Sequence, residues 1–181
     1  MKPIDFVLEP YPNLPLPEGV RISGSSRRVA AILHLNWRLE GPEGAIALSP
    51  PAVQPKRLRE LWEETCFECF LTSPDHPGYW EFNLSPAGHW NVFRFDSYRS
   101  GMTDEPAFDT LPFSVSSRPG LCEVTASVDT TRLGIAAAPW LLAVSTVIKE
   151  SGGRATYWAL SHPGSQPDFH HPESFGIQLS R

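Results

Sequence analysis

The chain has 181 residues, a net charge of −5 and 41% hydrophobic residues, an ordinary balance for one globular domain. The negative charge, without any basic stripe, argues against a nucleic-acid partner, because phosphate binding requires clustered Lys and Arg. No apolar run reaches the roughly 18 residues that a membrane span needs. The first residues, Met-Lys-Pro-Ile-Asp-Phe, contain no apolar signal core, so we expect a cytoplasmic protein that does not bind membranes.

We expect residues 1–181 to form a single domain, because neither an internal repeat nor a shift in composition marks a boundary. Residues 1–20 contain five prolines and predict an extended N-terminal arm. Val29–Leu39 then alternates apolar and polar residues, which predicts a long half-buried strand. The 19 prolines of the whole chain favour strands and loops over helices.

The next two segments predict a central hairpin. Trp62–Leu71 and Tyr79–Pro86 both alternate like strands, and the loop Thr72–Gly78 between them is rich in turn-forming residues. One face of this hairpin carries carboxylates and an amide where a solvated sheet usually carries Lys, Thr and Ser. The residues on that face are Glu64, Cys66 and Glu68 on the first strand and Tyr79, Glu81 and Asn83 on the second.

Further alternating segments follow at intervals of about ten residues. They predict strands at Trp90–Phe95, Leu121–Val128, Trp140–Lys149 and Ala155–Leu160, with a capped turn at Asp129–Gly134. Many short strands with turns between them predict an all-β fold, an antiparallel two-sheet β-sandwich of the jelly-roll or immunoglobulin-like kind with little helix.

Four separated segments, Leu61–Leu71, Tyr79–Asn91, Tyr98–Met102 and Pro167–Phe175, carry a resemblance to a known family. Their motifs include Tyr-Trp-Glu-Phe-Asn-Leu-Ser-Pro and Pro-Asp-Phe-His-His-Pro. In this respect the chain resembles the DOMON-like proteins, which are related to family 9 carbohydrate-binding modules. The resemblance implies a β-sandwich whose relatives bind either sugars or haem, and it narrows the fold more than the function.

The polar hairpin face is the first candidate site. In a meander with the appropriate register, Glu81 would lie near both Glu68 and Arg94, and the guanidinium would neutralise a patch of carboxylates. Buried carboxylates need a partner or a ligand. The alternative is an ion-pair network on a solvated sheet.

Aromatic residues near this face favour a sugar as the ligand, because flat rings suit the apolar side of a sugar and carboxylates suit its hydroxyls. Trp62 and Trp90 lie where strands begin and are the stacking candidates, although most strand tryptophans belong to a core. The predicted ligand-binding residues are therefore Trp62, Glu64, Glu68, Glu81, Asn83, Trp90, Arg94, Tyr98, Arg99, His162 and His170.

Weaker patterns leave other functions open. Asp168, His170 and His171 could hold a metal ion, but adjacent histidines usually diverge and this proline-bounded loop also fits a structural role. Haem-binding relatives use Met with His or Lys as axial ligands, which makes Met102 the candidate for haem b.

We expect a non-catalytic domain that binds a saccharide or sugar derivative and holds no cofactor. The alternatives are a haem-binding domain, a structural domain with a protein partner, and a carboxylate-based hydrolase.

Overall fold

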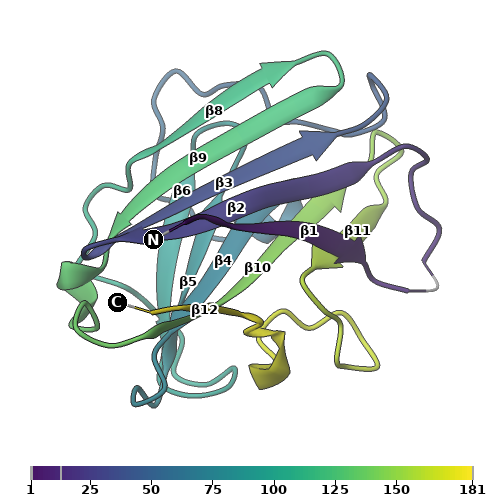
Figure 1. Cartoon of the computed structure of the whole chain (residues 1–181). Helices are drawn as coiled ribbons and strands as arrows, with labels where there is room; N and C mark the ends of the chain where they lie inside the picture. The colour runs from purple at the N-terminus through teal and green to yellow at the C-terminus, as the bar shows by residue number, and fades with distance from the viewer. Residues whose placement is uncertain (1, 13, 181) are drawn as a thin grey trace.

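The computed structural model describes residues 2–12 and 14–180, which form twelve β-strands and three short 3-10 turns (Figure 1). The strands are β1 (Ile4–Pro10), β2 (Arg21–Val29), β3 (Ile32–Glu40), β4 (Cys66–Thr72), β5 (Tyr79–Leu84), β6 (Trp90–Phe95), β7 (Thr103–Asp104), β8 (Phe113–Arg118), β9 (Leu121–Asp129), β10 (Trp140–Lys149), β11 (Ala155–Ala159) and β12 (Ile177–Leu179). The turns are η1 (Leu61–Glu63), η2 (Thr130–Leu133) and η3 (Pro172–Ser174). Among the described residues, no helix has the length and apolar character to cross a bilayer.

The strands form one strongly curled antiparallel sheet. Its order is β7-β6-β5-β4-β10-β11-β1-β2-β3-β9-β8, and β12 also pairs with β10. The all-β, antiparallel, nearly helix-free prediction is confirmed. The predicted division into two separate sheets is not confirmed. Strand β1 pairs with β2 along one edge and, through Glu9 and Pro10, with β11 along the other, so the strands form one continuous sheet.

The core lies inside the curl, where β2, β3 and β9 pass in front of β4, β5 and β6 (Figure 1). Alternate residues of β3 point inward, and Trp37 packs against Phe67 of β4 with ring centroids 6.2 Å apart. β4 and β5 are buried along nearly their whole length. They therefore need cover on the outer face as well, and a second apolar cluster provides it there.

Two N-terminal predictions need correction. Part of the segment predicted as an arm, Ile4–Pro10, is strand β1 and pairs on both of its edges. The strand predicted at Val29–Leu39 begins only at Ile32, because Ala30 turns the chain at φ 52°. The single-domain and arm predictions also included residues 1, 13 and 181, which lie outside the described residues.

Candidate functional site

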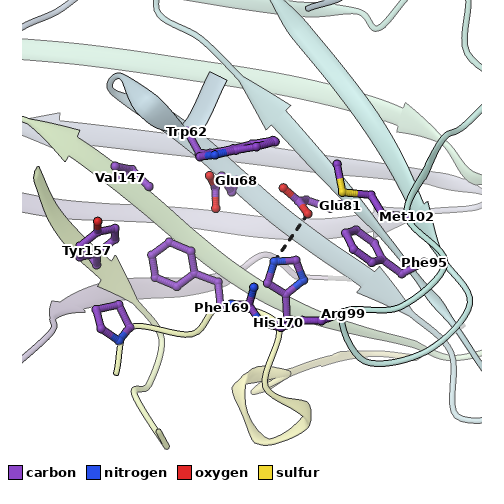
Figure 2. Close-up of a pocket in the computed structure, with 11 residues that line it drawn as sticks. Trp62, Glu68, Glu81, Phe95, Arg99, Met102, Val147, Tyr157, Phe169 and His170 are labelled. Atoms are coloured by element: carbon purple, nitrogen blue, oxygen red, sulfur yellow. Dashed lines mark ion pairs between the residues drawn. The ribbon is translucent and has the colours of Figure 1, made fainter. Parts of the chain in front are cut away.

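A pocket of about 390 Å³ lies on the outer face of β4, β5, β10 and β11, on the side of the sheet away from the core (Figure 2). Its volume is at the small end of the range for small-molecule sites. The C-terminal segment between β11 and β12, residues 160–176, forms one side, and the end of η1 forms another. The lining residues are Trp62, Glu68, Glu81, Phe95, Arg99, Met102, Val147, Tyr157, Pro167, Phe169 and His170.

The register of β4 and β5 brings two carboxyl groups together on the floor of the pocket. Glu68 lies opposite Asn83, and Phe70 lies opposite Glu81, so the two glutamates are diagonal neighbours on one face. The intervening residues of both strands point into the core. Glu68 is 3% exposed and Glu81 5% exposed, so these carboxyl groups are held in the body of the sheet.

Burial dominates the protonation of both glutamates. It raises the pKa of Glu81 to about 7, although a hydrogen bond from Asn83 and the charge of Arg99 act in the opposite direction. Burial also raises the pKa of Glu68 well above its ordinary value, and the charge of Glu81 adds to this rise. Ser145 Oγ donates to Glu68 Oε2 at 3.3 Å.

The oxygens of Glu81 are in different environments. Oε1 accepts a hydrogen bond from Asn83 Nδ2 at 2.7 Å. Oε2 faces His170 Nε2 at 3.8 Å, the contact drawn as a dashed line in Figure 2. That distance is too long for a hydrogen bond, and none of the described residues donates one to Oε2. Asn83 Oδ1 is likewise buried without a hydrogen-bond partner.

Tyr79 positions the imidazole of His170. The Tyr79 hydroxyl accepts a hydrogen bond from the Arg99 backbone N–H at 3.2 Å and lies 2.8 Å from His170 Nδ1. With the hydroxyl as donor to Nδ1, the imidazole proton lies on Nε2, directed toward Glu81. Burial, with a contribution from the charge of Arg99, lowers the pKa of His170 to about 4. Burial also raises the pKa of Tyr79 to about 12.

Asp168 holds the C-terminal segment against the loop after β6. It accepts hydrogen bonds from Arg99 Nη2 at 2.8 Å, from the Tyr98 hydroxyl at 2.5 Å and from the His170 backbone N–H at 3.1 Å. Burial alone would raise the pKa of Asp168, but the hydrogen bonds from Tyr98 and Arg99 outweigh it and the pKa is lowered. The carboxylate is therefore the counter-ion of Arg99.

Aromatic side chains form the walls above this floor. Figure 2 shows the indole of Trp62 lying across one side of the pocket, with Tyr157 and Phe169 on the other side and Phe95 beside Met102. Trp62 is half-buried and packs against Phe93, with ring centroids 5.9 Å apart. The arrangement combines flat apolar faces with buried hydrogen-bonding groups.

The structure brings together about half of the residues predicted from the sequence. Trp62, Glu68, Glu81, Arg99 and His170 line the pocket, and Asn83 lies beside its floor. Met102, the candidate axial ligand of the alternative haem-binding function, also lines the pocket and is 41% exposed.

Two predicted residues belong to the other face of the sheet. Trp90 is a core residue with the guanidinium of Arg57 over its ring at 5.4 Å, so it cannot stack on a ligand in this pocket. Arg94 lies opposite Trp80, whereas Glu81 lies opposite Phe93. Because neighbouring residues on a strand point to opposite faces, the expected contact between Glu81 and Arg94 does not form.

Three more predicted residues lie outside the pocket. Glu64 is exposed beyond η1. The Tyr98 side chain is exposed, and its hydroxyl is bound to Asp168. His162 donates from Nε2 to the Glu9 carbonyl oxygen at 2.8 Å, which ties it to β1.

The candidate metal ligands do not converge. Asp168 bonds with Arg99 and Tyr98, while His171 Nδ1 accepts from the Glu173 backbone N–H at 3.2 Å. Within residues 2–12 and 14–180, no three His, Cys, Asp or Glu side chains are grouped as a metal site requires.

Five lining residues were not anticipated: Phe95, Val147, Tyr157, Pro167 and Phe169. Alternation assigns Phe95 to one face of β6 and Tyr157 to one face of β11. Only the order of the strands in the sheet shows that these faces lie on the same side as Glu81. Phe169 lies between Asp168 and His170 in a loop, where alternation gives no information about direction.

No protein-family model matches the chain, and no curated protein matches it in sequence. Solved structures do match. A candidate carbohydrate-binding protein from Bacteroides uniformis ATCC 8492 superposes with a TM-score of 0.69 at 12% identity, over 98% of this chain and 85% of that one. A family 9 carbohydrate-binding module from Caldicellulosiruptor kristjanssonii, in complex with cellotriose, superposes with a TM-score of 0.59 at 10% identity, over 98% of this chain and 81% of that one.

A further structure of a family 9 module from Caldicellulosiruptor kristjanssonii, in complex with glucose, gives a TM-score of 0.53 at 12% identity, over 91% of this chain and 78% of that one. At such identities the likeness concerns the fold. The chain therefore has the fold of family 9 carbohydrate-binding modules.

Proposed function

We propose that this protein is a non-catalytic domain that binds a small saccharide or sugar derivative in the pocket between Trp62 and the two buried glutamates. The observation that carries the proposal is the pairing of an aromatic face with fixed hydrogen-bonding groups. Trp62 offers its ring to the apolar side of a sugar, while Glu68, Glu81 and His170 offer acceptors and a donor to its hydroxyls. The sugar-bound modules with the same fold add support.

The finer family assignment is part of the same proposal. We infer that the chain belongs with the DOMON-like relatives of those modules, on the strength of its Tyr-Trp-Glu-Phe-Asn-Leu-Ser-Pro and Pro-Asp-Phe-His-His-Pro motifs. Haem is the ligand of other such relatives, so a haem protein is the competing outcome. A Soret band after incubation with hemin, lost in Met102→Ala, would support haem over a sugar.

The direct test is titration calorimetry of the purified protein with glucose, cellobiose, glucosamine and N-acetylglucosamine. Trp62→Ala should weaken binding of any sugar that binds by about tenfold or more, because one wall of the site is lost. The matched pair Arg99→Ala and Arg94→Ala separates the pocket from the opposite face of the sheet. Only the former should change affinity. Equal affinities in Trp62→Ala and wild type would refute the site.

One observation favours a second function. Two buried carboxyl groups lie side by side, and burial raises the pKa of both, a combination that glycosidases use for acid–base catalysis. Turnover of aryl glycosides by the wild type, abolished by Glu81→Gln and retained by Glu64→Gln, would identify a hydrolase.

A further inference from the structure

The floor of the pocket has more acidic than basic groups. Glu68 hydrogen-bonds with the neutral hydroxyl of Ser145 and Glu81 with the neutral amide of Asn83. Neither has a Lys or Arg nitrogen within 4.0 Å among the described residues. Since an uncompensated buried carboxylate is costly, these groups either keep a proton or receive a cation.

Among the described residues, the basic groups beside the pocket do not form ion pairs with the two glutamates at hydrogen-bonding distance. Arg99 lines it but pairs with Asp168 at 2.8 Å, so its charge acts on Glu81 only at a distance and is outweighed there by burial. His170 is neutral near pH 7, because burial and the charge of Arg99 disfavour the imidazolium and lower its pKa to about 4. The buried Cys66 thiol also lies beside the glutamates, and its pKa is raised by burial and then by the charge of Glu68.

One glutamate oxygen is available to a ligand. Glu81 lines the pocket and is 5% exposed, yet its Oε2 accepts no hydrogen bond from any described residue. His170 Nε2 stands 3.8 Å from this oxygen. The aromatic walls of Trp62, Tyr157 and Phe169 surround the same space, and aromatic faces attract cations as carboxylates do.

We propose that the ligand is an amino sugar, held through its protonated amine by the carboxylates of Glu68 and Glu81 and through its ring by Trp62. This inference rests on the proposed function and names the class of saccharide. With a neutral sugar the carboxyl groups would have to keep their protons. An ammonium group supplies that charge and up to three donors, one of which can reach Glu81 Oε2.

Binding of a cation should release protons. A glutamate that holds a proton in the free protein gives it to the buffer when the ammonium group takes its place beside the carboxylate, and the amine stays protonated throughout. The protein loses a proton from a carboxyl group and gains the charge of the ligand, so charge and atoms balance. This proton release can be measured on the wild-type protein, and a neutral sugar should release fewer protons.

The experiment is titration calorimetry of the full chain at pH 6.5 with glucosamine, glucose and N-acetylglucosamine, in two buffers that differ in ionisation enthalpy. We expect glucosamine to bind at least tenfold more tightly than the other two. We also expect its apparent enthalpy to change with the buffer because protons are released. Glu81→Gln should reduce the preference to less than about threefold, whereas Glu64→Gln, exposed and outside the pocket, should keep it.

The other outcomes are distinct. Equal binding of glucose and glucosamine overturns the amino-sugar inference and leaves the proposed function intact. Binding of tetramethylammonium with no sugar binding refutes the proposed function and shows an ammonium site of another kind. If neither sugars nor tetramethylammonium bind at millimolar concentration, both proposals fail. Unchanged preference in a folded Glu81→Gln variant also overturns the inference.

Discussion

Glu81 and His170 face each other with pKa shifts that act on stability in opposite directions. A carboxyl group whose pKa is higher when folded contributes stability at low pH, and that contribution is lost as pH rises from about 4.5 to about 7. An imidazole whose pKa is lowered from 6.5 to about 4 contributes stability at high pH, and loses it as pH falls through that interval. The two effects partly cancel in the wild type.

Substituting either residue should reveal the contribution of the other. We expect the free energy of unfolding of His170→Gln to fall as pH rises from 4.5 to 7, by on the order of 2–3 kcal/mol. In Glu81→Gln the contribution of His170, which grows between pH 4 and 6.5, should offset that of the remaining Glu68, so the fall should be much smaller. Urea denaturation at half-unit pH steps measures both slopes. The exposed Glu64→Gln should follow the wild type, and parallel curves for all four proteins would contradict the pKa assignments.

Gly24 is a residue whose lack of a side chain matters. It lies opposite Phe6 across the β1–β2 pair, and a Cβ there would come within 2.5 Å of Phe6 Cζ and would overlap the Asn36 carbonyl oxygen. We expect Gly24→Ala to destabilise the fold by about 2–3 kcal/mol. Gly152, which has open space around it, provides the control, and Gly152→Ala should change stability by less than about 0.5 kcal/mol. Equal melting temperatures would refute the overlap.

Among the larger elements, the C-terminal segment is held beside the loop after β6 by the carboxylate of Asp168. Asp168 accepts hydrogen bonds from the side chains of Arg99 and Tyr98 and from the His170 backbone N–H. It therefore positions the pocket wall that carries Phe169 and His170. Asp168→Asn should weaken ligand affinity by about tenfold and speed hydrogen exchange in residues 160–176, while leaving β4 and β5 protected. Glu173→Gln, exposed in the same segment, is the matched control. Unchanged affinity in Asp168→Asn would show that the segment keeps its position without the hydrogen bonds of the Asp168 carboxylate.

The sequence allowed the elements of the site to be predicted better than their pairing. Alternation placed Glu68, Glu81 and Asn83 on one face, because the period of a strand is readable from residues alone. The register of β5 against β6 is not readable in this way, and a shift of one residue moves Arg94 to the opposite face. β2 was missed because its Ser- and Arg-rich sequence lacks the apolar alternation of its neighbours.

At the scale of the whole molecule, β1 joins the two halves of the sheet and the shared core joins them again. We therefore expect one cooperative unfolding transition, with fluorescence and circular dichroism giving the same midpoint. Leu8→Ala, in the core on β1, should lower the free energy of unfolding by about 2–5 kcal/mol and move both midpoints together. Val7→Ala, on the same strand but 45% exposed, should cost less than about 1 kcal/mol. Separate midpoints would mean that the halves unfold independently.

The unequal burial of the tryptophans has a practical consequence. Trp37, Trp80, Trp90, Trp140 and Trp158 are all buried, whereas Trp62 is half-buried at the pocket. A molecule entering the pocket changes the surroundings of that one indole and leaves the other five as a constant background. The protein thus carries its own optical probe of occupancy. A change in emission that disappears in Trp62→Phe would let any compound be tested at micromolar protein concentration without a label.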